Sequence, residues 1–102
     1  MNCDEISEKF IKNLIYKNKV VIFGDSNDEY THKAINFFQS NFKYYKKETN
    51  VFLDKVQLNL PDCLIKKTGS NKTPMIFLNG MYIGGWRNVE NMHYRRDFDI
   101  FF

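Results

Sequence analysis

The chain has 102 residues, a length that holds one domain and excludes a second folding unit, so we take residues 1–102 as a single domain. Apolar residues make up 43% and charged residues 26%, close to globular averages, which excludes wholesale disorder. The formal net charge is +3, and lysines such as Lys46-Lys47 and Lys66-Lys67 come in pairs. We therefore expect no nucleic-acid partner, because phosphate binding needs a concentrated basic face.

Two helices and a strand are predicted in the first forty residues. Between Asp4 and Lys17, apolar residues recur at helical spacing, with acids in the first turn and lysine in the last. The run 19–24 predicts a strand buried on both faces. Ser26 and Glu29 fit a capping box, which predicts that they open a second helix. The apolar residues of the first helix are Ile6, Phe10, Ile11, Leu14 and Ile15, and those of the second are Ala34, Ile35, Phe37 and Phe38.

The middle of the chain gives a weaker pattern. Residues 42–48 predict a second strand, with tyrosines on opposite faces. We interpret residues 49–60 as a connection with room for an extra helix. Pro61 suits the first turn of a short helix that stops at Gly69.

The last third predicts a hairpin and a helix. Residues 75–78 form a continuous apolar run, and Asn79-Gly80 is a strong turn signal into a partner strand over residues 81–83. Gly84-Gly85 ends that strand. Apolar residues from Val89 onward predict one closing helix.

No segment is suited to a membrane or to a targeting signal. The longest wholly apolar runs, residues 20–23 and 75–78, are far short of the roughly 20 residues that a bilayer span needs. Acidic residues near the N-terminus do not suit a signal or transit peptide. We therefore expect no membrane association and a cytoplasmic location.

Three segments form the most specific pattern in the chain. They are Lys19-Val20-Val21-Ile22-Phe23 before a capped helix, Thr73-Pro74-Met75-Ile76-Phe77-Leu78-Asn79-Gly80, and Tyr82-Ile83-Gly84-Gly85. In this order and spacing they resemble the glutaredoxin family over nearly the whole chain. The resemblance implies an α/β thioredoxin-like (glutaredoxin) fold, with a four-stranded mixed sheet flanked by helices on both faces. It also implies that Pro74 is a cis-proline that faces the start of the active-site helix.

The catalytic motif of that family is missing. In the family, the first strand leads into Cys-Pro-Tyr-Cys, whose first cysteine is a thiolate at a helix N-terminus and attacks disulfides. Aligned with that motif, this chain has Asp28-Glu29-Tyr30-Thr31. Asp28 stands at the nucleophile position and Thr31 at the resolving position, so we expect no catalytic residue and no iron–sulfur ligand there. A carboxylate suits the helix dipole, and we expect Asp28 to be a cap or a binding residue.

The glutathione face of the family is also altered. Its counterpart here, by resemblance, consists of Asp25, Tyr30, Thr73, Pro74, Gly84, Gly85, Trp86, Arg87 and Asn88. Asp25 replaces a lysine of the family, and Trp86, Arg87 and Asn88 replace acidic residues. Because Asp25 and Asp28 would repel an anionic ligand, with Arg87 compensating in part, we expect no cofactor and weak glutathione binding at most.

Neither cysteine nor either histidine is expected to replace the missing chemistry. Two cysteines cannot make a disulfide scaffold, and no metal-ligand spacing is present. We expect Cys63 to be a small buried hydrophobe and Cys3 to be at most an adventitious thiol. His32 and His93 are expected to be surface or hydrogen-bonded histidines.

The prediction is a degenerate, redox-inactive glutaredoxin-like protein. We expect it to act as a non-catalytic binding or scaffold protein, as a subunit of a larger complex, and to meet a protein partner through the former active-site face. Trp86 has two interpretations: a binding residue beside Arg87, or a half-buried side chain that packs the last helix. The alternative function is that of an atypical glutathione-dependent thiol–disulfide oxidoreductase, with residual glutathione binding and a role in cell redox homeostasis.

Overall fold

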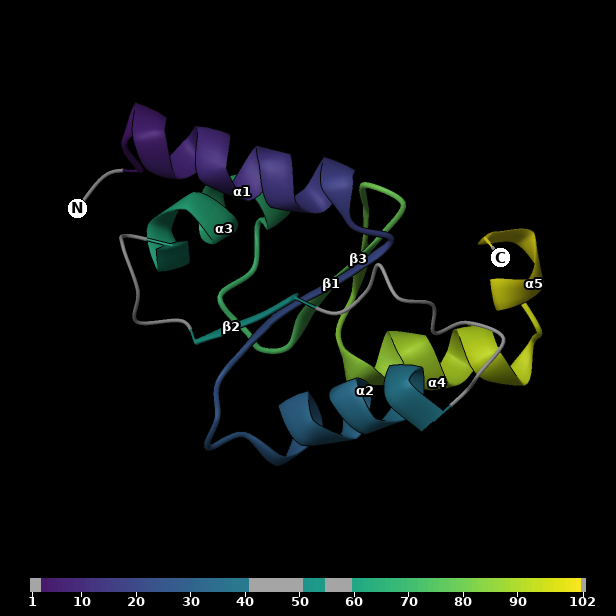
Figure 1. Cartoon of the computed structure of the whole chain (residues 1–102). Helices are drawn as coiled ribbons and strands as arrows, with labels where there is room; N and C mark the ends of the chain where they lie inside the picture. The colour runs from purple at the N-terminus through teal and green to yellow at the C-terminus, as the bar shows by residue number, and fades with distance from the viewer. Residues whose placement is uncertain (1–2, 41–50, 55–59, 102) are drawn as a thin grey trace.

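A mixed sheet lies at the centre of the molecule (Figure 1). The computed structural model describes residues 3–40, 51–54 and 60–101. The strands β1 (Val20–Gly24), β2 (Val51–Asp54), β3 (Met75–Leu78) and β4 (Met81–Gly84) follow the order β2-β1-β3-β4. The antiparallel part is formed by β1, β3 and β4, and β2 pairs with β1 in parallel. The predicted thioredoxin-like α/β fold is confirmed.

Helices cover both faces of this sheet. They are α1 (Glu5–Lys17), α2 (Glu29–Ser40), α3 (Leu60–Thr68), α4 (Trp86–Tyr94) and α5 (Phe98–Phe101). In Figure 1, α1 and α3 lie on one side of the sheet, and α2 and α4 lie on the other. Within the described segments, no helix is long and apolar enough to cross a membrane.

Strand β1 is buried on both faces, as its sequence predicts, and therefore divides the core into two clusters. Val21 and Phe23 pack with α1 and α3, whereas Val20 and Ile22 pack with α2, α4 and α5. This alternation follows from the two-residue period of a strand.

Helix α1 is amphipathic, but fewer of its apolar side chains are buried than its sequence predicts. Ile11 and Ile15 are buried, whereas Ile6 is 82% exposed and Phe10 is 41% exposed. The stripe that meets the sheet repeats every four residues, from Ser7 through Ile11 to Ile15, and Ile6 and Phe10 lie beside it.

The predicted capping box at Ser26 and Glu29 is wrong, because α2 begins later. The backbone N–H of Asp28 donates to the carbonyl of Asp25, and the N–H of Asn27 donates to the Asp25 carboxylate. These bonds fold residues 25–28 into a turn. Asp28 then caps the helix that begins at Glu29.

The second strand lies later in the chain than predicted. The predicted strand over residues 42–48 falls outside the described residues. Strand β2 (Val51–Asp54) falls in the stretch that we interpreted as a connection, so that interpretation is wrong. A strand of four residues is too short to show a period, and its pairing with β1, thirty residues away in sequence, is a tertiary effect.

The hairpin signal is confirmed, whereas the single closing helix is wrong. Asn79 and Gly80 have φ angles of 50° and 83°, the positive values that a tight hairpin turn requires. The closing segment divides into α4 and α5 around Arg96, whose φ is 63°. The N–H groups of Arg96 and Asp97 donate back to the carbonyls of His93 and Met92, the bonding of a Schellman motif.

Candidate functional site

Asp28 lies at the start of α2, and its carboxylate joins that helix to a distant loop. Its Oδ1 accepts a hydrogen bond from the backbone N–H of Tyr30 at 3.1 Å. Its Oδ2 accepts one from the Thr31 hydroxyl at 3.0 Å and one from the Thr73 hydroxyl at 2.8 Å. The bond to Thr73 spans 45 residues of sequence. Asp28 is therefore a helix cap, which is one of the two roles predicted for it. Its hydrogen bond to Thr73 also joins α2 to the loop before β3.

These contacts set the charge state of Asp28. Partial burial acts to raise its pKa, as does the negative charge of Asp25, but the hydrogen bonds from Thr73, Tyr30 and Thr31 outweigh both and lower the pKa below the ordinary 3.8. The side chain is consequently an ionised carboxylate at neutral pH, and it accepts hydrogen bonds on both oxygens.

Thr31, which the resemblance aligns with the family's resolving position, is fully buried. Its hydroxyl donates to Asp28 and accepts a bond from the backbone N–H of Asp25 at 3.2 Å. Gly24 makes room for it, because a Cβ at that position would overlap the Thr31 side chain. Thr31 thus fixes the turn between β1 and α2 and exposes no reactive group.

The loop opposite Asp28 has the geometry that the resemblance implies. The Thr73–Pro74 peptide bond is cis. Gly84 has a φ of 110°, and a Cβ there would overlap Asn88, whose side-chain amide donates to the carbonyl of Ile83 at 2.8 Å. Glycine at position 84 therefore allows the end of β4 to lie close against the first turn of α4.

A pocket of about 500 Å³ opens beside this loop. We call it the cis-proline groove, and its walls are Tyr30, Ser70, Lys72, Thr73, Pro74, Tyr82, Ile83, Gly84, Gly85, Trp86, Arg87 and Asn88. The walls come from the first turn of α2, the loop before β3, strand β4 and the start of α4. Three aromatic side chains and two cations therefore face one concave surface.

Eight of the predicted face residues meet in the cis-proline groove. Asp25, Asp28 and Thr31 do not line it. Sequence reasoning missed Lys72, Ser70, Tyr82 and Ile83. Their adjacency to Thr73-Pro74 and to Gly84-Gly85 was the available signal, since neighbours of a wall residue in an extended segment also approach the groove.

Trp86 has the half-buried position of one of its two interpretations, and the other, a role in binding, stays a prediction. It is half-buried, and its ring lies 6.0 Å from that of Phe37 on α2 in an edge-to-face contact. It also lines the cis-proline groove. Packing against α2 thus holds the indole in place at the wall of the groove.

The expectation for the cysteines is half wrong. Cys63 is buried as predicted, with 4% exposure, but neither residue has a free thiol, because Cys3 and Cys63 form a disulfide. Sequence spacing alone did not indicate that pairing, since 60 residues separate them and the fold brings α1 against α3.

The histidines lie in two different environments. Nε2 of His32 donates to the carbonyl of Ser26 at 2.7 Å, and the ring of His93 lies 5.0 Å from that of Phe37. Among the residues that the structure describes, no group of three or more His, Cys, Asp or Glu side chains could hold a metal ion.

The fold is that of glutaredoxins of known structure. Wheat glutaredoxin superposes with a TM-score of 0.79 at 17% identity, over 94% of this chain and 88% of that one. Buckwheat glutaredoxin in complex with glutathione gives 0.77 at 19% identity, over 90% and 83%. Oxidised glutaredoxin 2 from Chlamydomonas reinhardtii gives 0.76 at 23% identity, over 92% and 88%. No protein-family model and no curated protein matches the chain significantly by sequence.

Proposed function

We propose that this glutaredoxin-like protein binds a protein partner through the cis-proline groove and has no thiol–disulfide oxidoreductase activity there. One observation carries the proposal. Asp28, which the resemblance aligns with the nucleophilic cysteine of glutaredoxins, lies at the start of α2, and its carboxylate accepts hydrogen bonds from Thr73, Thr31 and the N–H of Tyr30. A carboxylate does not exchange disulfides, because exchange requires a thiolate.

The position of the two sulfur atoms supports this proposal. The sequence has two cysteines, and they form a disulfide that joins the residue before the cap of α1 to α3. Those helices cover the sheet face opposite α2 (Figure 1). Neither sulfur atom lines the cis-proline groove, so no side chain in its walls supplies a thiol.

The chemistry of the groove supports binding. Tyr30, Tyr82 and Trp86 offer aromatic surface, and Lys72 and Arg87 offer positive charge. Tyrosine, tryptophan and arginine are the residues that most often dominate protein–protein affinity. The groove therefore favours an extended segment that has apolar and acidic side chains, and we propose that such a segment belongs to another subunit of a larger complex.

Two experiments test this function. In a glutathione-coupled assay with a small disulfide substrate, any turnover by the wild-type protein should be lost in Cys63→Ser, because the cis-proline groove has no thiol in its walls. Robust turnover that survives in Cys63→Ser would contradict the proposal.

Restoring the motif with Asp28→Cys, Glu29→Pro and Thr31→Cys should give only feeble turnover, since Asp25 remains beside the site. Full activity would show that the groove still binds glutathione well.

Binding is tested by capture from native extract. A partner held in the groove should be lost with Arg87→Ala and with Trp86→Ala, and retained with Tyr94→Ala. Tyr94 is the matched control, because it is an aromatic residue on the same helix, is 91% exposed and lies outside the groove. Equal capture by all variants would contradict a role for the groove.

Glutathione is a second candidate ligand, favoured by one observation. Lys72 and Arg87 place two cations in the groove, whereas neither Asp25 nor Asp28, the predicted repulsive pair, lines it. Titration calorimetry with glutathione should show weak binding that weakens further in Lys72→Gln. Unchanged affinity in that variant would place the ligand elsewhere.

A further inference from the structure

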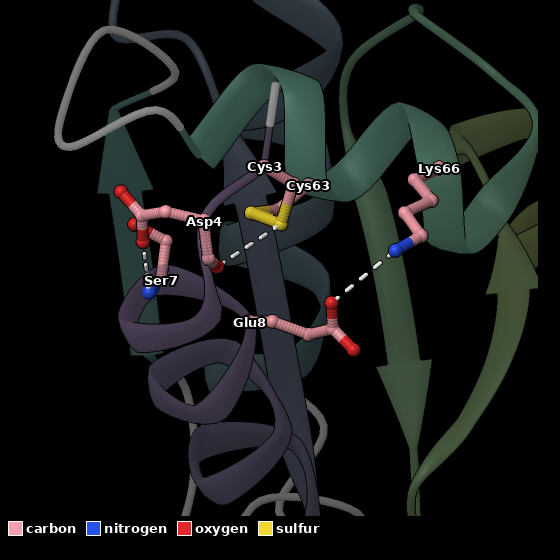
Figure 2. The surroundings of a disulfide bond; sticks show 6 residues. All are labelled: Cys3, Asp4, Ser7, Glu8, Cys63 and Lys66. Atoms are coloured by element: carbon pink, nitrogen blue, oxygen red, sulfur yellow. Dashed lines mark hydrogen bonds and ion pairs between the residues drawn. A yellow bond between two sulfur atoms is a disulfide. The ribbon is translucent and has the colours of Figure 1, made fainter.

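The Cys3–Cys63 disulfide joins the start of α1 to the first turn of α3. Cys3 precedes Asp4, which caps α1 by accepting a hydrogen bond from the N–H of Ser7 at 2.7 Å (Figure 2). Cys63 is the fourth residue of α3 and contributes to the core between those helices and the sheet. The bond therefore ties an N-terminal segment to the core on the face away from the cis-proline groove.

Solvent reaches this disulfide through a second pocket. It has a volume of about 330 Å³, lies between α1 and α3, and has both cysteines in its walls. Cys63 is 4% exposed, whereas Cys3 is only partly buried. A small molecule in the pocket therefore reaches the sulfur of Cys3 more readily than that of Cys63.

The walls of the pocket are basic. Lys12 comes from α1, and Lys66 and Lys67 come from α3, against one acidic residue, Glu8. Nζ of Lys66 lies 3.3 Å from the Glu8 carboxylate, as Figure 2 shows, so that pair offsets itself. Lys12 and Lys67 leave the pocket with a positive field next to a disulfide, and such a field concentrates anions.

We propose that this pocket is a thiol–disulfide exchange site for anionic low-molecular-weight thiols, with Cys3 as the attacked residue. An incoming thiolate bonds to Sγ of Cys3 and breaks the Cys3–Cys63 bond, and the electron pair of that bond leaves on Cys63, which then takes a proton from water. A second thiolate attacks the small-molecule sulfur of the mixed disulfide. It releases Cys3 as a thiolate and leaves the two small molecules oxidised to their own disulfide.

The fold favours this direction of attack. Cys63 lies in the first turn of α3, where the helix dipole supplies partial positive charge that stabilises a departing thiolate. The rest of α1 stays docked, because Ile11 and Ile15 remain in the core. Exchange therefore releases the segment around Cys3 without unfolding the domain. The sequence predicts a cytoplasmic location. The thiols of the cytoplasm would favour the form in which the Cys3–Cys63 bond is reduced.

The test compares, on the full chain, a thiol that carries further negative charge with a thiol whose only charge is that of its thiolate. Reduction of the disulfide is followed by alkylation and mass spectrometry, with glutathione or β-mercaptoethanol as the reductant. Each rate is expressed per thiolate, so that reactivity is separated from charge. At an ionic strength of about 0.01 M, Lys12→Gln with Lys67→Gln should slow reduction by glutathione by roughly fivefold and slow reduction by β-mercaptoethanol less, because the attacking thiolate of glutathione carries about two negative charges and that of β-mercaptoethanol carries one. The difference should vanish at about 1 M salt.

Lys17→Gln with Lys33→Gln is the matched control, since it removes the same charge from residues outside the pocket. It should leave both rates unchanged. The early glutathione adduct should be found on Cys3. Equal slowing by both double variants, an adduct on Cys63, or a purified protein whose two thiols stay free in glutathione disulfide would each overturn the proposal.

Discussion

Among the described residues, two regions on opposite faces of the sheet each hold a bond between distant parts of the sequence. At the cis-proline groove, Asp28 and Thr73 join α2 to the loop before β3 by a hydrogen bond across 45 residues. On the other face, Cys3 and Cys63 join α1 to α3 by a covalent bond across 60 residues. The cis-proline groove, which resembles a redox site, has no cysteine in its walls. The two cysteines lie on the other face, in a region without that resemblance.

The loss of thiol chemistry that we propose is compatible with this fold, because the fold and the chemistry depend on different features of the chain. The groove keeps the cis-proline, the glycine at position 84 and a helix start that favours negative charge, and these features depend on backbone geometry. Thiol chemistry depends on one side-chain atom, and at position 28 that atom is a carboxylate oxygen. Each tie can be removed by a single substitution, which allows their contributions to be compared directly.

The largest effect is expected from the covalent tie. A disulfide that closes a loop of this length stabilises a protein by about 3 to 4 kcal/mol, chiefly by restricting the unfolded chain. Cys3→Ala should lower the free energy of unfolding of the oxidised protein by that amount, measured by urea denaturation. Because Cys3 is only partly buried, the substitution leaves little cavity.

Reductant supplies the control for that measurement. With the disulfide reduced, the wild type and Cys3→Ala should unfold at nearly the same urea concentration. If the two proteins already coincide without reductant, the bond contributes nothing to stability, and the comparison between the two faces is lost.

A smaller effect is expected from the polar tie. Asp28→Ala removes the cap of α2 and leaves the buried Thr31 hydroxyl without its acceptor, so the free energy of unfolding should fall by about 1 to 2 kcal/mol. Asp28→Asn keeps one acceptor oxygen and should lose about half as much. Equal stability of the wild type and Asp28→Ala would mean that Asp28 ties nothing.

The sequence predicted the parts of the fold that depend on local signals. The buried run of β1 and the Asn79-Gly80 turn each follow from a few adjacent residues, and the resemblance supplied the mixed sheet. The errors fall where distant residues decide. Strand β2 forms by pairing with β1, and the start of α2 is set by the side chains of Asp25 and Asp28.

The site was predictable in the same measure. The resemblance placed residues 84–88 and Thr73-Pro74 on one face, and in the structure they line one groove. The hydrogen bond of Thr73 to Asp28 and the Cys3–Cys63 bond were not predictable. Each joins residues far apart in sequence, and each requires a side-chain orientation that no spacing encodes.

The smallest effect is the pH dependence of the polar tie. The folded pKa of Asp28 lies below its ordinary value of 3.8, so the unfolded state binds the proton more tightly. The ionised carboxylate therefore stabilises the fold at pH values above 3.8, and this contribution disappears as the pH falls through the folded pKa. The stability difference between the wild type and Asp28→Asn should be constant from about pH 7 to about pH 5 and shrink towards about pH 2. A difference that stays constant, or grows, on acidification would show that the hydrogen bonds of Thr73 and Thr31 do not depend on the charge of Asp28. The contact between Asp28 and Thr73, which joins α2 to the cis-proline groove, would then not depend on charge.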